Sequence, residues 1–131
     1  MMTADGKEYV MQNQYPQQMM NLEVIRRVRL LEKEGVVRYI EVFHNPTSAP
    51  ISTMVDLRTN FNGRFKDVVT DRGQANPTTL GKREQGVLVL PSNANQKALA
   101  YVVCSSRAGL KAEAISTQNQ YNMTFHYQIS V

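Results

Sequence analysis

Apolar and polar residues alternate with a period of two in several stretches of this chain. In residues 22–30, every second position except Arg26 is apolar, and most of the positions between them are charged. Residues 36–43 are rich in β-branched and aromatic side chains, and residues 51–58 again alternate cleanly. A period of two places alternate side chains on opposite faces of a strand. The pattern therefore predicts three consecutive strands, the first of them suited to a half-buried antiparallel sheet.

A helix over residues 21–33 is the alternative for the first of these stretches. Apolar residues near one helical face would be Leu22, Ile25, Val28 and Leu31. The residues that follow favour a strand, because 32–35 form a short polar connection that contains Gly35. Glycine can adopt the positive φ that a four-residue hairpin loop often needs. The strand is the preferred interpretation, and the helix stays open.

The second half of the chain contains its clearest strand patterns. Residues 85–91 are apolar on both faces, which predicts a central strand that ends at Pro91. Residues 97–104 predict another buried strand, with Cys104 as a small core residue. In residues 122–131, one face is wholly apolar and the other is polar and uncharged. These runs predict the interior of an all-β fold.

Shorter or weaker signals complete the chain. Strands are predicted at residues 8–11, 66–69 and 110–116, the last of which also allows a helical turn because of its alanines. Tight turns are predicted at residues 62–63 and 105–109, which are rich in Asn, Ser and Gly. Turn signals therefore recur roughly every 8 to 12 residues, as in two-sheet antiparallel sandwiches.

The connection between the second and third strands carries a resemblance. It reads Asn-Pro-Thr-Ser-Ala-Pro over residues 45–50, where Asn and Ser can bond to nearby backbone and hold a turn. Residues 36–57 resemble immunoglobulin-like and fibronectin-like accessory domains of bacterial multidomain proteins. The resemblance implies a non-catalytic, partner-binding or spacer role and carries over no functional residue. The tryptophan and paired cysteines of antibody-type domains are absent from the sequence, which has no Trp and one Cys.

These observations predict an all-β fold, a two-sheet antiparallel β-sandwich of about 7–9 strands that is immunoglobulin-like. Residues 1–20 are polar and rich in Met and Gln, and they predict an N-terminal arm that reaches a neighbouring subunit or forms a loose terminus. Residues 21–131 are predicted to form a single β-sandwich domain, because 131 residues suffice for one domain with its own core.

The composition excludes a disulfide and a membrane span but does not identify the cellular compartment. The single cysteine excludes an internal disulfide. No apolar run approaches the roughly 20 residues of a membrane span, and the first residues lack the layout of a signal peptide. We therefore expect no membrane insertion, and a chain that is either cytoplasmic or a domain excised from a larger protein. The net charge of +4 permits an acidic partner, although scattered basic residues also serve solubility.

The sequence offers little for catalysis. His44 and His126 are the only histidines, and Cys104 lies in an apolar strand pattern away from any expected cleft. One Cys and two distant His do not make a zinc site, and no spacing singles out a pair of carboxylates. Glycine-rich phosphate loops are also absent from the sequence. We therefore expect no enzyme, no cofactor, no metal and no small-molecule substrate.

Binding is the remaining class of function. The leading hypothesis is an interaction or structural module that binds a protein partner or itself within a larger assembly. The alternative is a nucleic-acid or carbohydrate-binding module that uses an arginine face with an interleaved tyrosine, made of Arg26, Arg27, Arg29, Arg38 and Tyr39. The irregular stretch 71–82 is a second candidate for partner binding, because binding residues concentrate on long loops; it contributes Arg72 and Asn76.

Overall fold

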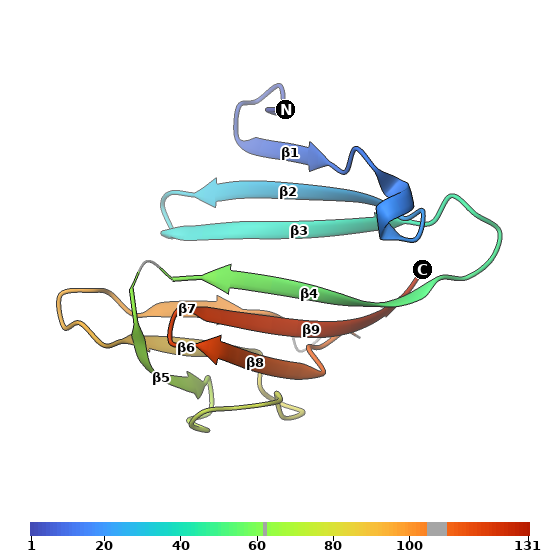
Figure 1. Cartoon of the computed structure of the whole chain (residues 1–131). Helices are drawn as coiled ribbons and strands as arrows, with labels where there is room; N and C mark the ends of the chain where they lie inside the picture. The colour runs from blue at the N-terminus through green and yellow to red at the C-terminus, as the bar shows by residue number, and fades with distance from the viewer. Residues whose placement is uncertain (62, 105–109) are drawn as a thin grey trace. The chain divides into compact units, whose positions relative to one another are not determined.

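A computed structural model describes residues 1–61, 63–104 and 110–131 (Figure 1). In these residues the protein is all-β, as predicted, with nine strands in three antiparallel sheets of three strands each. The elements are β1 (Glu8–Gln12), a 3₁₀ helix η1 (Pro16–Met19), β2 (Glu23–Leu31), β3 (Val36–His44), β4 (Ser52–Asn60), β5 (Phe65–Thr70), β6 (Gly86–Pro91), β7 (Leu99–Val102), β8 (Ala114–Asn119) and β9 (Asn122–Ser130). The strands thus divide among three sheets, where two were predicted.

The chain forms two compact units. The first comprises Met1–Ser52 with Ser130–Val131, and the second comprises Thr53–Ile129. The predicted division into an arm of residues 1–20 and a domain of residues 21–131 stays a prediction. Among the described residues, no helix has both the length and the apolar character that crossing a membrane requires.

The first unit is built on the sheet β1-β2-β3, with β2 in the middle. Strands β2 and β3 pair along their whole length, from Glu23 opposite His44 to Leu31 opposite Val36. This pairing confirms the strand for residues 22–30 over the alternative helix. Gly35 closes the hairpin with a φ of +64°, a conformation that glycine adopts without steric cost.

Strand β1 brings part of the N-terminal segment into this sheet. Its five residues pair with β2, from Glu8 opposite Arg29 to Gln12 opposite Ile25. Just beyond it, the side-chain oxygen of Asn13 accepts a hydrogen bond from the N–H of Val24 at 2.8 Å. The short strand predicted at residues 8–11 is therefore confirmed.

The connection at residues 45–50 is held by its asparagine. The Asn45 amide donates to the carbonyls of Ala49 at 2.8 Å and Val131 at 2.9 Å. Its oxygen accepts from the N–H of Thr47 at 2.9 Å and from that residue's hydroxyl at 2.7 Å. One side chain thus bonds to backbone groups of Thr47, Ala49 and Val131, as expected for a turn asparagine.

The second unit contains the sheets β4-β9-β8 and β5-β6-β7. Aromatic side chains from both sheets are in contact in its core: the ring centroid of Tyr101 on β7 lies 6.0 Å from that of Phe125 on β9. Phe61 stands edge-on to Tyr101 at 5.7 Å and to Phe65 at 5.4 Å. Apolar residues buried in this unit include Val68, Val87, Val89, Ile115, Met123 and Ile129. The apolar face predicted for the last strand therefore points into a core.

One prediction about burial is wrong. Residues 97–104 do not form a buried strand: β7 is short and lies at the edge of its sheet. Leu99 is 50% exposed and Val102 is 79% exposed. An apolar sequence cannot distinguish an edge strand from a central one, because that difference depends on sheet order. Cys104, which follows this strand, is buried as predicted.

Two turn predictions reach beyond the part of the chain that the structure describes. The turn at residues 105–109 lies entirely outside it, and so does Asn62 of the turn at residues 62–63. Strand β8 begins at Ala114 and is extended, so the predicted strand at 110–116 is confirmed in its second half.

Candidate interaction surfaces

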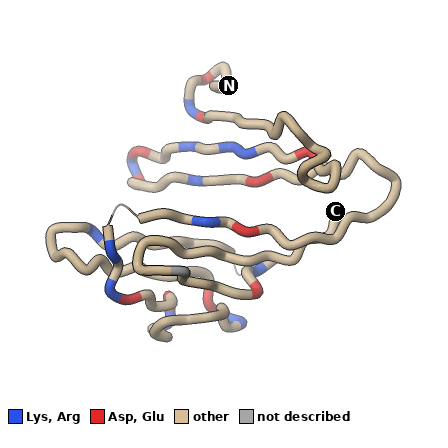
Figure 2. Tube along the Cα trace, in the orientation of Figure 1, with Lys and Arg blue, Asp and Glu red and all other residues tan. Residues whose placement is uncertain are grey.

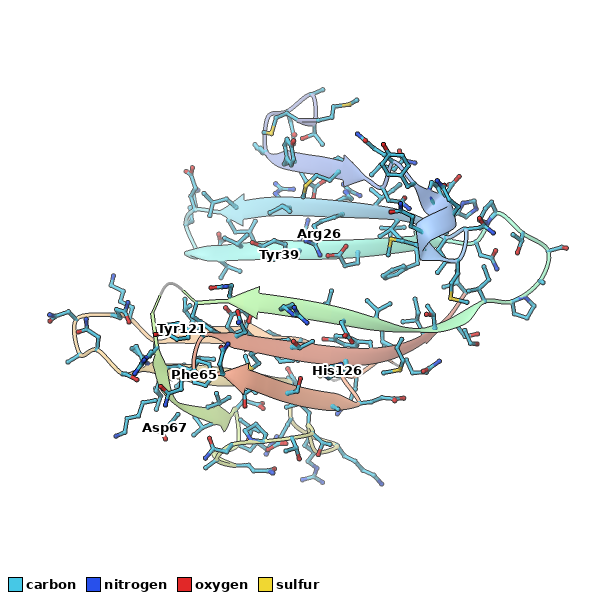
Figure 3. The ribbon with its side chains drawn as sticks, in the orientation of Figure 1. Arg26, Tyr39, Phe65, Asp67, Tyr121 and His126 are labelled. Carbon is cyan, nitrogen blue, oxygen red and sulfur yellow. The ribbon has the colours of Figure 1, made fainter. Side chains whose placement is uncertain are left out.

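The predicted arginines lie on neighbouring strands but not on one face. Residues that are paired across an antiparallel ladder share a face, and consecutive residues of a strand point to opposite faces. Arg29 pairs with Arg38, which places these two with Arg27 on one face. Arg26 pairs with Glu41 and therefore lies on the other face, together with Tyr39 (Figure 3).

Two carboxylates form ion pairs with three of these four arginines. The side chain of Glu8, only 4% exposed, forms ion pairs with Arg27 and, at 3.5 Å, with Arg38. On the other face, Nε of Arg26 lies 2.5 Å from Oε1 of Glu41. Figure 2 shows these charges along β2 and β3. An arginine already paired within its own sheet has less to offer a phosphate, since binding must replace or share the existing partner.

Apart from Arg26 and Glu41, this second face is apolar. Register places eight apolar side chains on it, which we call the apolar face: Tyr9, Met11, Val24, Val28, Leu30, Val37, Tyr39 and Phe43. Each is half-buried or exposed, and the exposed fraction reaches 57% for Leu30 and 62% for Tyr39. Contiguous exposed apolar side chains of this kind mark interaction sites on soluble proteins.

The irregular stretch after β5 forms a basic cavity of about 290 Å³ in the second unit. Its lining brings Arg72 together with Lys82, the last residue of the predicted irregular stretch. Three further residues that were not predicted to bind a partner complete the lining: Arg83, Gln85 and Lys111. Asn76, predicted with Arg72, is not among the lining residues. It has a left-handed backbone with a φ of +48°, and its N–H donates to the carbonyl of Val68 at 2.7 Å. Asn76 therefore has a structural role in this turn.

Buried polar contacts fix the loop that makes this cavity. Glu84, 6% exposed, accepts hydrogen bonds from the hydroxyl of Thr70 and from the N–H of Gly81, the latter at 2.6 Å. The carboxylate of Asp71 accepts from the N–H of Gln85 at 3.0 Å. This hydrogen bond is the main reason why the pKa of Asp71 is lowered. Both acids are thus engaged with the loop's own backbone.

No protein-family model, no curated protein and no solved structure matches this chain.

A third arrangement crosses the sheet β4-β9-β8. Nδ1 of His126 lies 2.7 Å from Oδ1 of Asp56, and Nε2 of the same ring lies 2.8 Å from Oγ of Ser116 (Figure 3 labels His126). The sequence pointed to His126 as one of two candidate bases but gave no partner for it. Hydrogen bonds to the neighbouring strands on either side supply both partners. An acid, an imidazole and a hydroxyl in this order also occur in serine hydrolases.

Other reactive groups are poorly placed for chemistry. Cys104 is buried, and its thiol donates to the carbonyl of Glu84 at 3.4 Å. Burial raises the pKa of this thiol, so it is a weak nucleophile near neutral pH. Within the part of the chain that the structure describes, no three His, Cys, Asp or Glu side chains gather as a metal site would require.

Proposed function

We propose that this protein is a non-catalytic β-sheet interaction module that associates with a second copy of itself through the apolar face. The single observation that carries the proposal is the set of exposed apolar side chains on β1, β2 and β3, with Tyr39 and Leu30 the most exposed. Burying such side chains against a partner releases roughly 25 cal/mol for each Å² of apolar surface removed from water.

Charge favours a second copy as the occupant. The apolar face carries one positive and one negative side chain, Arg26 and Glu41, side by side. In a twofold-symmetric pair both copies use the same patch, and every contact occurs twice, once in each direction. Arg26 of one copy can then face Glu41 of the other, and the interface carries no net charge from these groups. A face with one sign of charge would repel its own copy.

The concentration dependence of mass in solution tests this association, with two matched variants. Val37 and Val36 are neighbours on β3, are both 46% exposed and point to opposite faces. We expect Val37→Asp to weaken association at least tenfold, because it places a charge inside the interface, and Val36→Asp to weaken it less than twofold. A chain that stays monomeric at all concentrations, or equal effects of the two variants, would overturn the proposal.

A charge swap distinguishes self-association from binding to another protein. Arg26→Glu and Glu41→Arg should each associate poorly alone, because like charges then face one another. Mixed in equal amounts, they should form a heterodimer, since each variant supplies the charge that the other lacks. If no heterodimer forms while wild-type protein dimerises, Arg26 and Glu41 do not face one another across the interface.

We also propose that the second unit is an immunoglobulin-like sandwich. The ring contacts between Tyr101 and Phe125, which lie on different sheets, support face-to-face packing of β4-β9-β8 on β5-β6-β7. An experimental structure with strand order and crossing angle measured would test it; sheets that cross near 90° would contradict an aligned sandwich.

We propose further that the Ser116–His126–Asp56 row orders the strands and does not react. Acyl transfer needs backbone N–H donors aimed at the developing oxyanion. Next to Ser116 along the edge strand, the N–H of Ile115 already donates to the carbonyl of Thr78 at 2.7 Å. The hydroxyl, the ring and the carboxylate satisfy one another across three strands, which is how cross-strand polar pairs stabilise a sheet.

A fluorophosphonate probe tests this role. We expect no covalent adduct at Ser116, and Ser116→Ala should cost about 1 kcal/mol of unfolding free energy through the lost hydrogen bond. Ser52→Ala is a matched control, because the Ser52 hydroxyl lies 3.1 Å from that of Ser130 in an exposed position. Labelling that disappears in Ser116→Ala and His126→Ala, but persists in Ser52→Ala, would establish a reactive serine and overturn the non-catalytic proposal.

A further inference from the structure

We propose that the basic cavity of the second unit binds a multiply charged phosphate group. Four cationic side chains line it: Arg72, Lys82, Arg83 and Lys111. No carboxylate is among the lining residues, and none of the ion pairs between described residues involves any of these four cations. The cavity volume of about 290 Å³ lies at the lower end of the range for small-ligand sites.

Two acids of the same loop offset this charge only in part. Asp71 and Glu84 accept hydrogen bonds from the loop itself, and neither of them lines the cavity, which has four cations around it. Arg72 acts on Asp71 through charge alone, as a minor contribution to the lowered pKa of that carboxyl. Four like charges around one small cavity repel each other, and a bound anion removes that repulsion. The local electrostatics therefore favour a ligand with more than one negative charge.

The cations are positioned before any ligand arrives. Nζ of Lys111 donates to the carbonyls of Lys82 at 2.6 Å and Gly81 at 3.2 Å. Nε of Arg72 donates to the carbonyl of Arg83 at 3.2 Å. Both side chains are thus held by backbone carbonyls of residues 81–83, and less conformational entropy is lost when an anion binds.

Donor capacity remains after these internal bonds. An ammonium has three N–H donors, so two bonds to carbonyls leave Lys111 one donor for a ligand. A guanidinium has five, so one bond from Nε leaves Arg72 its terminal N–H groups, which match the spacing of two phosphate oxygens. Arg83 offers a second fork of the same geometry. Planar forks that bind two oxygens at once favour phosphate over a monovalent anion.

Pyrophosphate, sulfate and citrate are the probes for calorimetric titration of the full chain at low and moderate ionic strength. We expect pyrophosphate to bind, with an affinity that falls as salt rises. Sulfate should bind more weakly because it carries fewer charges. Citrate should also bind more weakly, since three carboxylates on a flexible chain fit two guanidinium forks less well. No binding of pyrophosphate at low salt, or citrate binding as tightly as pyrophosphate, would overturn the proposal.

Matched variants separate the cavity from general charge. Lys111→Gln and Arg83→Gln each remove one positive charge from the cavity, and we expect each to weaken pyrophosphate binding about tenfold. Lys66→Gln removes the same charge from an exposed site and should weaken binding less than twofold. Arg83→Gln keeps the anchored Lys111, so it tests the site even if Lys111→Gln disturbs the loop. Equal weakening by Arg83→Gln and Lys66→Gln would overturn the proposal.

Discussion

Phe125→Ala is expected to lower the unfolding free energy of the second unit by about 3–5 kcal/mol. The phenylalanine is 1% exposed on β9, and its ring meets that of Tyr101 on the other sheet of this unit. Truncation removes the ring from the core and leaves a cavity that its neighbours fill only in part. The loss therefore combines the transfer free energy of the ring with the cost of that cavity.

Urea denaturation measures this effect, and Val102→Ala is its control. Val102 lies on β7, which carries Tyr101, but its side chain is 79% exposed. We expect that control to change the unfolding free energy by less than about 0.5 kcal/mol. Similar losses for both variants would show that β7 and β9 do not pack together through the aromatic cluster.

The aromatic cluster also shows what sequence patterns can and cannot predict. The period of two in residues 122–131 correctly predicted a strand with one buried face, because local alternation directly reports the two sides of a strand. It could not predict that Phe125 would meet Tyr101. That contact depends on which strands lie in which sheet, and strand order is a long-range property.

The alternation of the strand already determines which arginines can share a face. Arg26 and Arg27 are adjacent in a strand, so a period of two already requires them to point to opposite faces. The same alternation placed Arg26 among the apolar residues of residues 22–30. A shared arginine face was therefore incompatible with the predicted strand. The pairing of Glu8 with Arg27 depends on β1 joining the sheet, which sequence alone did not specify in register.

The basic cavity was predictable in part. Its irregular loop and Arg72 were identified because Gly and Pro interrupt the strand pattern there. Lys111 lies 30 and 29 residues beyond Gly81 and Lys82, whose carbonyls accept its hydrogen bonds. The Ser116–His126–Asp56 row likewise joins residues that are distant in sequence, since Asp56 and His126 are seventy positions apart. Such clusters arise only from register and sheet order.

Raising the pH above 10 is expected to destabilise the second unit through Tyr127. This side chain is 6% exposed, and its hydroxyl donates to the carbonyl of Val103 at 3.1 Å. Burial raises the pKa of Tyr127 to about 12, with the nearby Cys104 as a smaller cause. The ordinary value is 10.0, which applies to the unfolded chain. Folded and unfolded states therefore bind this proton with different affinity over two pH units.

Whether rising pH stabilises or destabilises the fold depends on which state keeps the proton. Between pH 10 and pH 12 the unfolded chain loses the phenolic proton while the folded chain retains it, so rising pH favours unfolding. The stabilising contribution is fully present below pH 10 and declines as the pH rises toward the folded-state pKa. For one group with this shift, the loss between pH 9 and pH 12 is about 2 kcal/mol. An exposed tyrosine makes no such contribution, since folding does not change its surroundings.

Urea unfolding at pH 9, 10, 11 and 12 isolates this contribution. Three proteins are compared: wild type, Tyr127→Phe and Tyr15→Phe. All other ionisable groups are the same in wild type and Tyr127→Phe, so the difference between these two proteins reports Tyr127 together with its interaction with Cys104. Tyr127→Phe should start about 1 kcal/mol less stable because it lacks the hydrogen bond to Val103, and then lose less stability as the pH rises. Tyr15→Phe, at a position 57% exposed, should follow wild type. Parallel curves for wild type and Tyr127→Phe would mean that the phenol ionises equally easily in the folded and unfolded chain.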